Sequence, residues 1–135
     1  MSNITQVVKQ DKSLTTLNRG VTASGLNQVL SGTGPFTLFA PSDLAFGKLE
    51  GGVIENLLKA ENKLKLADLL NHHVVAGKVE FKDLKDGDKL KTMSGKELSI
   101  SIQNSKVSVN GAIIQQRDVK TSNGVIHSLD AVLKN

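Results

Sequence analysis

The three histidines are the residues of this chain whose chemistry most needs an explanation. His72 and His73 are adjacent at the end of a leucine-rich run, and His127 lies near the C-terminal end. A histidine can bind a metal ion, act as a general base, or stay neutral inside a core. A metal site would need all three to converge, together with Asp68 or Asp130. Neighbouring residues of a helix point about 100° apart, and the His-Glu-x-x-His spacing is missing, so the sequence argues against a metal site.

The two adjacent histidines are expected to have different environments. His73 continues the helical spacing of Leu66, Leu69 and Leu70, which predicts a neutral histidine facing the core. His72 lies one residue off this apolar stripe, and we expect its side chain to be partly exposed. If His73 is buried and neutral, the fold must lose stability as the pH falls through about 6.5.

Other kinds of catalytic site find little support in the sequence. The chain has no cysteine, which excludes a disulfide, a thiolate nucleophile and a zinc–sulfur site. No Gly-x-Ser-x-Gly motif is present, and "SGTGP" at 31–35 lacks the lysine of a phosphate-binding loop. Asp86 and Asp88 flank Gly87 and therefore indicate a turn. We predict no enzymatic activity, no cofactor and no metal, although a metal or hydrolytic enzyme that uses the histidines stays open as an alternative.

The composition is that of one soluble domain with an aliphatic core. The chain has 135 residues, of which 39% are hydrophobic and 22% charged, and its four phenylalanines are its only aromatic residues. The net charge is +4, but residues 59–96 interleave nine basic with six acidic groups. Such mixing is typical of a solvated face, so we predict no nucleic-acid binding. No apolar run approaches the ~18 residues that span a bilayer.

Hydrophobic periodicity divides the chain into a helical part and a strand-rich part. Helical spacing marks 4–8, 14–21 and 26–30, and later 42–49, 53–58 and 61–74, with "FTLFA" at 36–40 as a short strand between them. In the helix at 42–49, Leu44, Phe46 and Leu49 are expected to be buried, with Ser42 as its N-cap. After residue 74 the period becomes two, with strand-like stretches at 74–81, 98–103, 107–109 and 125–133. Asn-Gly pairs at 110–111 and 123–124 predict tight turns. Helices followed mainly by strands indicate the α+β class.

Four segments, in this order along the chain, resemble the fasciclin-like domain, the adhesion module of fasciclin and periostin. They are "GPFTLFAPSDLAFGKL" at 34–49, "LLNHHVVAGKV" at 69–79, "VNGAIIQQRDV" at 109–119 and "NGVIHSLDAVL" at 123–133. The resemblance covers essentially the whole chain, and the full set is very specific. The short chain is most similar to single-domain bacterial members.

The resemblance implies a fold and a setting. It implies one α+β domain over residues 1–135, a wedge of two β-sheets with several α-helices packed along one side. It also implies a secreted, periplasmic or cell-surface location, which requires that an export signal has been removed. The expected role is adhesion or protein–protein binding to a cell-surface or extracellular protein, as a monomer that meets a membrane only through an anchor outside this chain. The alternative is a small-ligand carrier with an aliphatic pocket between helices and sheet.

The family motifs can be placed on individual residues. Those expected to be structural are Thr37, Phe39, Pro41, Asp43, Phe46, Asn123, Gly124, His127 and Asp130. Those expected to form the contact surface are Leu69, Leu70, His72, His73, Val74 and Val75. His73 matches the histidine of the family's tyrosine–histidine pair, whereas His72 stands where the family often has tyrosine. The segment around that pair is linked to integrin binding in animal members, and without the phenol we do not extend integrin adhesion to this chain.

Overall fold

The computed structural model describes residues 2–32, 34–48, 53–116 and 118–133. The helices are α1 (Ile4–Gln10), α2 (Thr15–Ser24), α3 (Leu26–Leu30), α4 (Asp43–Gly47), α5 (Val53–Leu57) and α6 (Lys63–Asn71), with short 3₁₀ turns η1 (Ala60–Asn62) and η2 (Phe81–Asp83). The strands are β1 (Phe36–Pro41), β2 (Val74–Ala76), β3 (Lys89–Lys91), β4 (Glu97–Gln103), β5 (Lys106–Val109), β6 (Ala112–Ile113), β7 (Val119–Thr121) and β8 (Gly124–Leu129).

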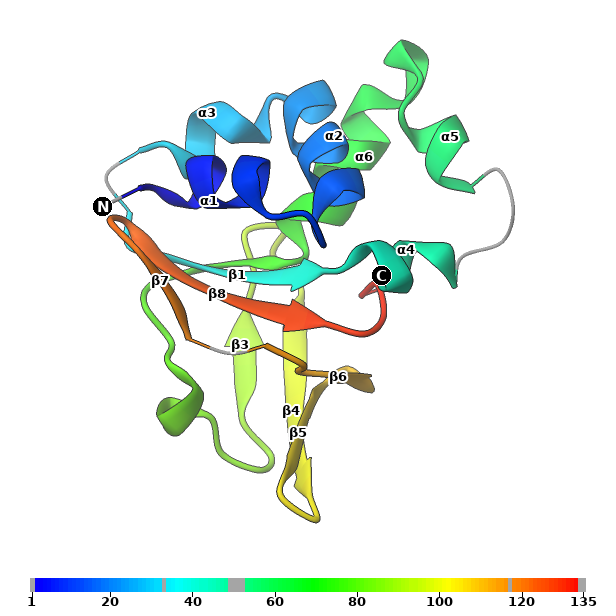
Figure 1. The fold of residues 1–135 in the computed structure, drawn as a ribbon. Coiled ribbons are helices and arrows are strands. Elements are labelled where there is room, and N and C mark those ends of the chain that lie inside the picture. Colours follow the sequence, from blue (N-terminus) through cyan, green and yellow to red (C-terminus); the bar gives the residue numbers. More distant parts are fainter. Residues whose placement is uncertain (1, 33, 49–52, 117, 134–135) are drawn as a thin grey trace.

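Two four-stranded sheets and a group of helices form three layers. The first sheet has the order β2-β1-β8-β7, and the second has the order β3-β4-β5-β6. Helices α1, α2, α3 and α6 lie on one side of the first sheet, and the second sheet lies on its other side (Figure 1). The α+β class predicted from the sequence, with two sheets and helices along one side, is therefore confirmed.

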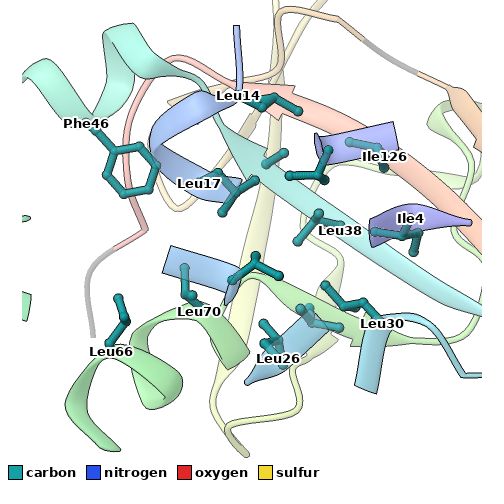
Figure 2. Packing of buried hydrophobic residues seen from close by; sticks show 14 residues of the cluster. Ile4, Leu14, Leu17, Leu26, Leu30, Leu38, Phe46, Leu66, Leu70 and Ile126 are labelled. Atoms are coloured by element: carbon teal, nitrogen blue, oxygen red, sulfur yellow. The ribbon is translucent and has the colours of Figure 1, made fainter. Parts of the chain in front are cut away.

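The central strands β1 and β8 run parallel and are buried on both faces. Their register pairs Phe36 with Gly124 and continues to the end of both strands. Leu38 and Ile126 belong to the hydrophobic cluster under the helices, which Figure 2 shows, whereas Phe39 belongs to the cluster that faces the second sheet. Each strand therefore contributes side chains to two cores, which is why its polar residues are buried as well.

The helix ends follow the local sequence. Asn3 caps α1 through a capping box with Gln6, and the hydroxyl of Ser42 accepts from the amide of Ala45 at the start of α4, as predicted. Asp43 has a contact that the sequence did not indicate. Its carboxylate accepts from the Thr16 amide at 2.8 Å and so caps α2 from outside that helix.

Several local predictions were wrong. Leu44 is 75% exposed rather than buried, because it lies about 200° around α4 from Phe46, so both cannot face the core; Leu49 lies outside the described residues. The predicted strand at 74–81 ends at Ala76, since Gly77 takes φ +111° and turns the chain away. The final strand ends at Leu129, not at residue 133.

The two Asn-Gly pairs have different roles. Asn110 and Gly111 have φ values of 49° and 88° and form the tight turn between β5 and β6 that was predicted. Gly124 has no such left-handed φ and begins β8 itself. A Cβ atom at Gly124 would overlap the carbonyl oxygen of Phe36, so glycine is needed here for the close approach of β1.

Replacing Gly124 should therefore damage the central strand pair. We expect Gly124→Ala to lower the free energy of unfolding by about 3 kcal/mol, because a methyl group in this contact forces the strands apart. The matched control is Gly47→Ala in α4, where no atom lies within 4 Å of the added Cβ and the change should be neutral or mildly stabilising. Denaturant unfolding of both variants measures the difference, and equal stabilities would contradict this account.

Candidate functional site

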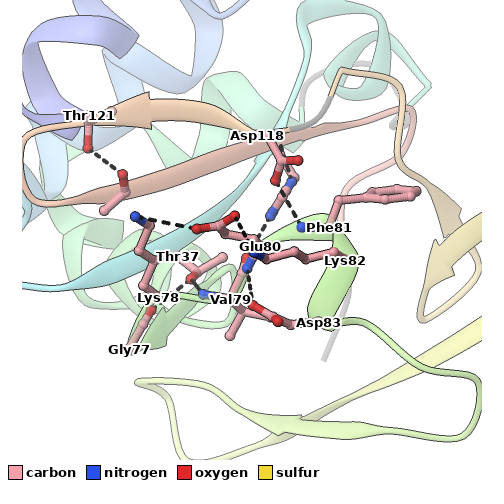
Figure 3. Close-up of polar contacts among 12 residues, drawn as sticks. Thr37, Gly77, Lys78, Val79, Glu80, Phe81, Lys82, Asp83, Asp118 and Thr121 are labelled. Carbon is pink, nitrogen blue, oxygen red and sulfur yellow. Dashed lines mark hydrogen bonds and ion pairs between the residues drawn. The ribbon is translucent and has the colours of Figure 1, made fainter.

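The segment that follows β2 is held by the hydroxyl of Thr37 instead of a strand partner. Thr37 lies in β1 and is fully buried. Its Oγ1 donates to the carbonyl oxygen of Gly77 at 2.7 Å and accepts from the amide of Val79 at 2.8 Å (Figure 3). One side chain thus bonds to two backbone groups, the Gly77 carbonyl and the Val79 amide, that have no strand partner after β2 ends.

His127 fastens the same segment from β8. Its Nε2 lies 2.8 Å from the carbonyl oxygen of Val79, and its Nδ1 lies 3.2 Å from the amide nitrogen of Asp118. A carbonyl can only accept and an amide can only donate, so the neutral ring carries its proton on Nε2. Phe39 stacks on this ring with centroids 5.6 Å apart.

Asp118 closes the network. Its φ of 54° is in the left-handed region, where aspartate is tolerated better than most residues. In this conformation its carboxylate accepts from the amide of Phe81 at 2.9 Å. We call this set of contacts from Thr37, Asp118 and His127 the backbone clamp.

The clamp presents charged side chains to solvent. Glu80 lies 3.4 Å from the ammonium group of Lys78 and 3.9 Å from that of Lys82. Burial lowers the pKa of His127, although its hydrogen bond to the Val79 carbonyl and the charges of Asp118 and Glu80 act in the opposite direction. His127 is therefore held as the neutral ring that the clamp requires.

His73 uses the opposite tautomer in a second backbone contact. Its Nδ1 lies 2.9 Å from the carbonyl oxygen of Leu69, and its Nε2 accepts from the amide of Leu133 at 2.9 Å. The proton is therefore on Nδ1. Burial lowers the pKa of His73 to about 4, with the nearby His72 adding to the shift and the Leu69 bond opposing it. The prediction of a buried, neutral His73 is confirmed.

The expected exposure of His72 was wrong. The residue is only 2% exposed, and Ser94, in the turn after Thr92, lies next to its ring. The Ser94 hydroxyl lies 3.4 Å from His72 Nδ1, which is longer than the contact of a nucleophile with its base. The Ser94 hydroxyl also lies 2.8 Å from the Thr92 hydroxyl, so Ser94 is bonded within its own turn.

Burial also changes the expected contact surface. Leu69 is half-buried, and the other five residues of this predicted surface are buried, namely Leu70, His72, His73, Val74 and Val75. A partner could not reach those five side chains in this conformation. Within 69–79, the exposed residues are Ala76 and Lys78, at the edge of the clamp.

The residues expected to be structural have visible contacts. Asn123 joins distant elements, since its side chain accepts from the amide of Ile4 and donates to the carbonyl of Leu30. Asp130 accepts from the amide of Ile113 at 2.8 Å. Seven of the nine residues in this set are buried, namely Thr37, Phe39, Pro41, Phe46, Asn123, Gly124 and His127.

No metal site is found in the part of the chain that the structure describes. No three His, Asp or Glu side chains there come together as a metal site. His73 and His127 each have both ring nitrogens bonded to the backbone, so neither is available as a general base. Asp86 and Asp88 accept from the amides of Ile102 and Lys85, as residues of a turn do.

Sequence reasoning missed Asp118 and Glu80 as members of the site. Their roles depend on a left-handed backbone residue and on a segment that bonds to β1 and β8. Neither leaves a periodic signal in the sequence. The glycine at position 77 was the one local sign that the strand pattern at 74–81 would break there.

Comparison with known proteins gives matches along almost the entire chain. The family model of the fasciclin domain matches residues 12–135. Protein sll1483 of Synechocystis sp. is 40% identical over 130 residues, which are 96% of this chain and 72% of that protein. Protein sll1735 of the same organism is 38% identical over 98% of both chains.

Larger animal proteins contain a similar domain. Transforming growth factor-beta-induced protein ig-h3 of Sus scrofa is 35% identical over 98% of this chain, which is only 19% of that protein. A solved pair of FAS1 domains from the insect cell adhesion molecule Fasciclin I superposes with a TM-score of 0.89 at 20% identity. That match covers 99% of this chain and about half (51%) of the solved chain, and it establishes the fold.

The His73 environment predicts a pH dependence. Its folded pKa of about 4 is below the unfolded value of 6.5, so its stabilising effect is complete above pH 6.5 and is lost as the pH falls towards 4. We expect the free energy of unfolding to fall by about 1.4 kcal/mol per pH unit in this window from His73 alone. Urea unfolding from pH 7.5 to 4.5 measures the slope. In His73→Gln, which cannot titrate, the slope should be smaller by this amount, and an unchanged slope would contradict the assignment.

The clamp can be tested at Thr37. Thr37→Val keeps the shape but removes the hydroxyl, leaving the Gly77 carbonyl and the Val79 amide without their partner, at a cost of about 2 kcal/mol. Hydrogen exchange at the Val79 amide should accelerate selectively. Thr37→Ser retains the hydroxyl and should keep that amide protected. Equal exchange rates in the two variants would show that the hydroxyl does not hold the segment.

Proposed function

This chain belongs to the fasciclin domain family, and from that premise we propose that it is a non-enzymatic interaction module that binds a protein in a secreted, periplasmic or cell-surface setting. Family membership supports this role, since the similar solved domain pair comes from a cell adhesion molecule. None of the described helices is long and apolar enough to cross a membrane.

The observation that carries the proposal is the backbone clamp and the surface it presents. We call residues 76–82 the clamped segment. Its exposed side chains include Lys78 and Lys82, while Glu80 between them is partly buried. Because Thr37, His127 and Asp118 fix its backbone, a partner would bind a segment that is already ordered. Little conformational entropy would be lost, which favours affinity.

This proposal moves the contact surface outward from the one predicted by sequence. Ala76, Lys78 and Lys82 meet the partner, whereas Leu70, His72, His73, Val74 and Val75 are buried. Two lysines around one glutamate favour a partner that offers carboxylates at this surface.

The small-ligand carrier stays the second candidate, but no observation favours it. The four surface hollows described are open and partly polar. The helix-side cluster shown in Figure 2 is filled by aliphatic side chains together with Phe46.

The proposal can be tested by crosslinking followed by a binding measurement. A photoreactive residue at position 78 should capture a cell-envelope protein from the source cells, which is then purified. We expect Lys78→Glu with Lys82→Glu to weaken its binding by at least about tenfold, because the charges at the contact are reversed. The control is Lys59→Glu with Lys65→Glu, which makes the same charge change on the helical layer and should leave affinity nearly unchanged. Equal losses in both variants, or no protein captured at position 78, would contradict the proposed surface.

A further inference from the structure

The outer face of the second sheet contains an open hollow that the clamp does not involve. Its volume is about 520 Å³, and its lining includes Ser101 and Gln103 of β4, Lys106 and Ser108 of β5, and Ile113 of β6. In Figure 1 these strands extend away from the helices, on the far side of β1 and β8. The hollow is therefore a separate feature of the surface.

Strand register explains why these side chains share one face. Ser101 pairs with Ser108, and Ser108 pairs with Ile113, so two hydroxyl groups and one aliphatic side chain form a row across three strands. Gln103 pairs with Lys106 in the next row. Residues directly opposite each other in a sheet point to the same side, and the residues between them, such as Ile100 and Val107, are buried.

The described strands place three lysines and one glutamate on this face. Lys89 pairs with Ser99, and Lys91 pairs with Glu97, on the same outward side as Lys106. Ser99 and Gln103 are four residues apart along β4. Their partners Lys89 and Lys106 are therefore separated by roughly 14 Å along the strand direction.

Two nearby carboxylates, in the turn before β3, accept hydrogen bonds from the backbone. Asp86 accepts from the amide of Ile102 at 2.9 Å, and Asp88 accepts from the amide of Lys85 at 3.1 Å. The first contact holds the turn before β3 against the edge of β4, and the second lies within that turn.

The hydrogen-bonding groups of the hollow are suited to a ligand with many hydroxyl groups. A serine hydroxyl donates and accepts, and a glutamine amide does both as well, as sugar hydroxyls require. Ser108 uses its proton only in a 3.4 Å contact with the Ser101 carbonyl, which is long for a hydroxyl donor. Ile113 is 37% exposed and provides an apolar side against which the C–H groups of a sugar ring can pack.

The residue types argue against the two other classes of macromolecule. The described lining of the hollow has two serines and no aromatic residue, methionine or arginine, the types that are enriched at the centres of protein–protein interfaces. Single-stranded nucleic acids are bound by aromatic residues that stack on bases, and the described lining of this hollow has none.

The tip of the β4–β5 hairpin, next to this hollow, contains two non-glycine residues with left-handed backbone conformations. Asn104, which also lines the hollow, has φ 51°, and Ser105 has φ 67°. Glycine would take the second position with less strain, as Gly111 does in the next turn. Serine at this position adds another exposed hydroxyl at the end of the face.

We propose that the outer face of β4, β5 and β6 is a binding site for an anionic polysaccharide. Ser101, Gln103 and Ser108 bond the sugar hydroxyls, Ile113 packs against the ring, and Lys106 with Lys89 pairs with carboxylate or sulfate groups along the polymer. This role does not depend on protein binding by the clamped segment.

Calorimetry with defined polymers tests the proposal on the whole chain. The probes are alginate and dextran sulfate as anionic polysaccharides, neutral dextran, and duplex DNA, all at about 0.15 M salt, where long-range attraction is largely screened. We expect one or both anionic polysaccharides to bind more tightly than DNA, and neutral dextran to bind weakly or not at all. Absence of binding to both anionic polysaccharides overturns the proposal, as does neutral dextran binding equally well. DNA binding as tightly overturns it too, because the face would then be a general site for polyanions.

Two sets of variants separate a built site from general attraction to a basic protein. Lys89→Gln with Lys106→Gln should weaken polysaccharide binding by about tenfold. Lys65→Gln with Lys120→Gln removes the same charge elsewhere and should change it by less than about twofold. Ser101→Ala with Ser108→Ala leaves the net charge unchanged and should still weaken binding by about fivefold. Thermal melting confirms that each variant folds, and losses that depend only on net charge overturn the proposal.

Discussion

The parallel pairing of β1 with β8 is the constraint on which the rest of this domain depends. It joins residues 36–41 to residues 124–129, and both strands are buried on both faces. The helices pack on one face and the second sheet on the other, so neither layer has a core of its own without this pair. Gly124 permits the pairing because any side chain there would overlap the backbone of Phe36.

Burial on both faces obliges the polar groups of these strands to find partners inside the protein, since an unpaired buried group is costly. Thr37 and His127 meet this demand by bonding to the segment that follows β2. His73 does the same for the chain after β8, with its proton on the other ring nitrogen. A neutral imidazole can join one backbone carbonyl to one backbone amide, and here two histidines use this property to hold together segments that are distant in sequence.

The interior therefore fixes the backbone, and the two surfaces that we propose for binding lie outside it. The clamped segment presents lysines around a glutamate on an ordered backbone, while the outer face of the second sheet presents hydroxyl, amide and ammonium groups around an open hollow. These surfaces differ in chemistry and are formed by different strands. A fold that is also found in a cell adhesion molecule can thus carry surface chemistry specific to this chain, because a surface residue can differ without disturbing the strand pair.

Periodicity and motif order were enough to predict the α+β class, the α1–α3 helices, the Ser42 cap and a buried His73, since these depend on spacing within one element. The fasciclin resemblance, carried by four short segments, gave the arrangement of sheets and helices. Only the tertiary structure decided that His72 is covered, that Leu44 is exposed and that Asp118 completes the clamp. The physical reason is that a local pattern shows which side of an element is apolar, whereas the elements that come to cover its other side are brought there by strand pairing between distant parts of the chain.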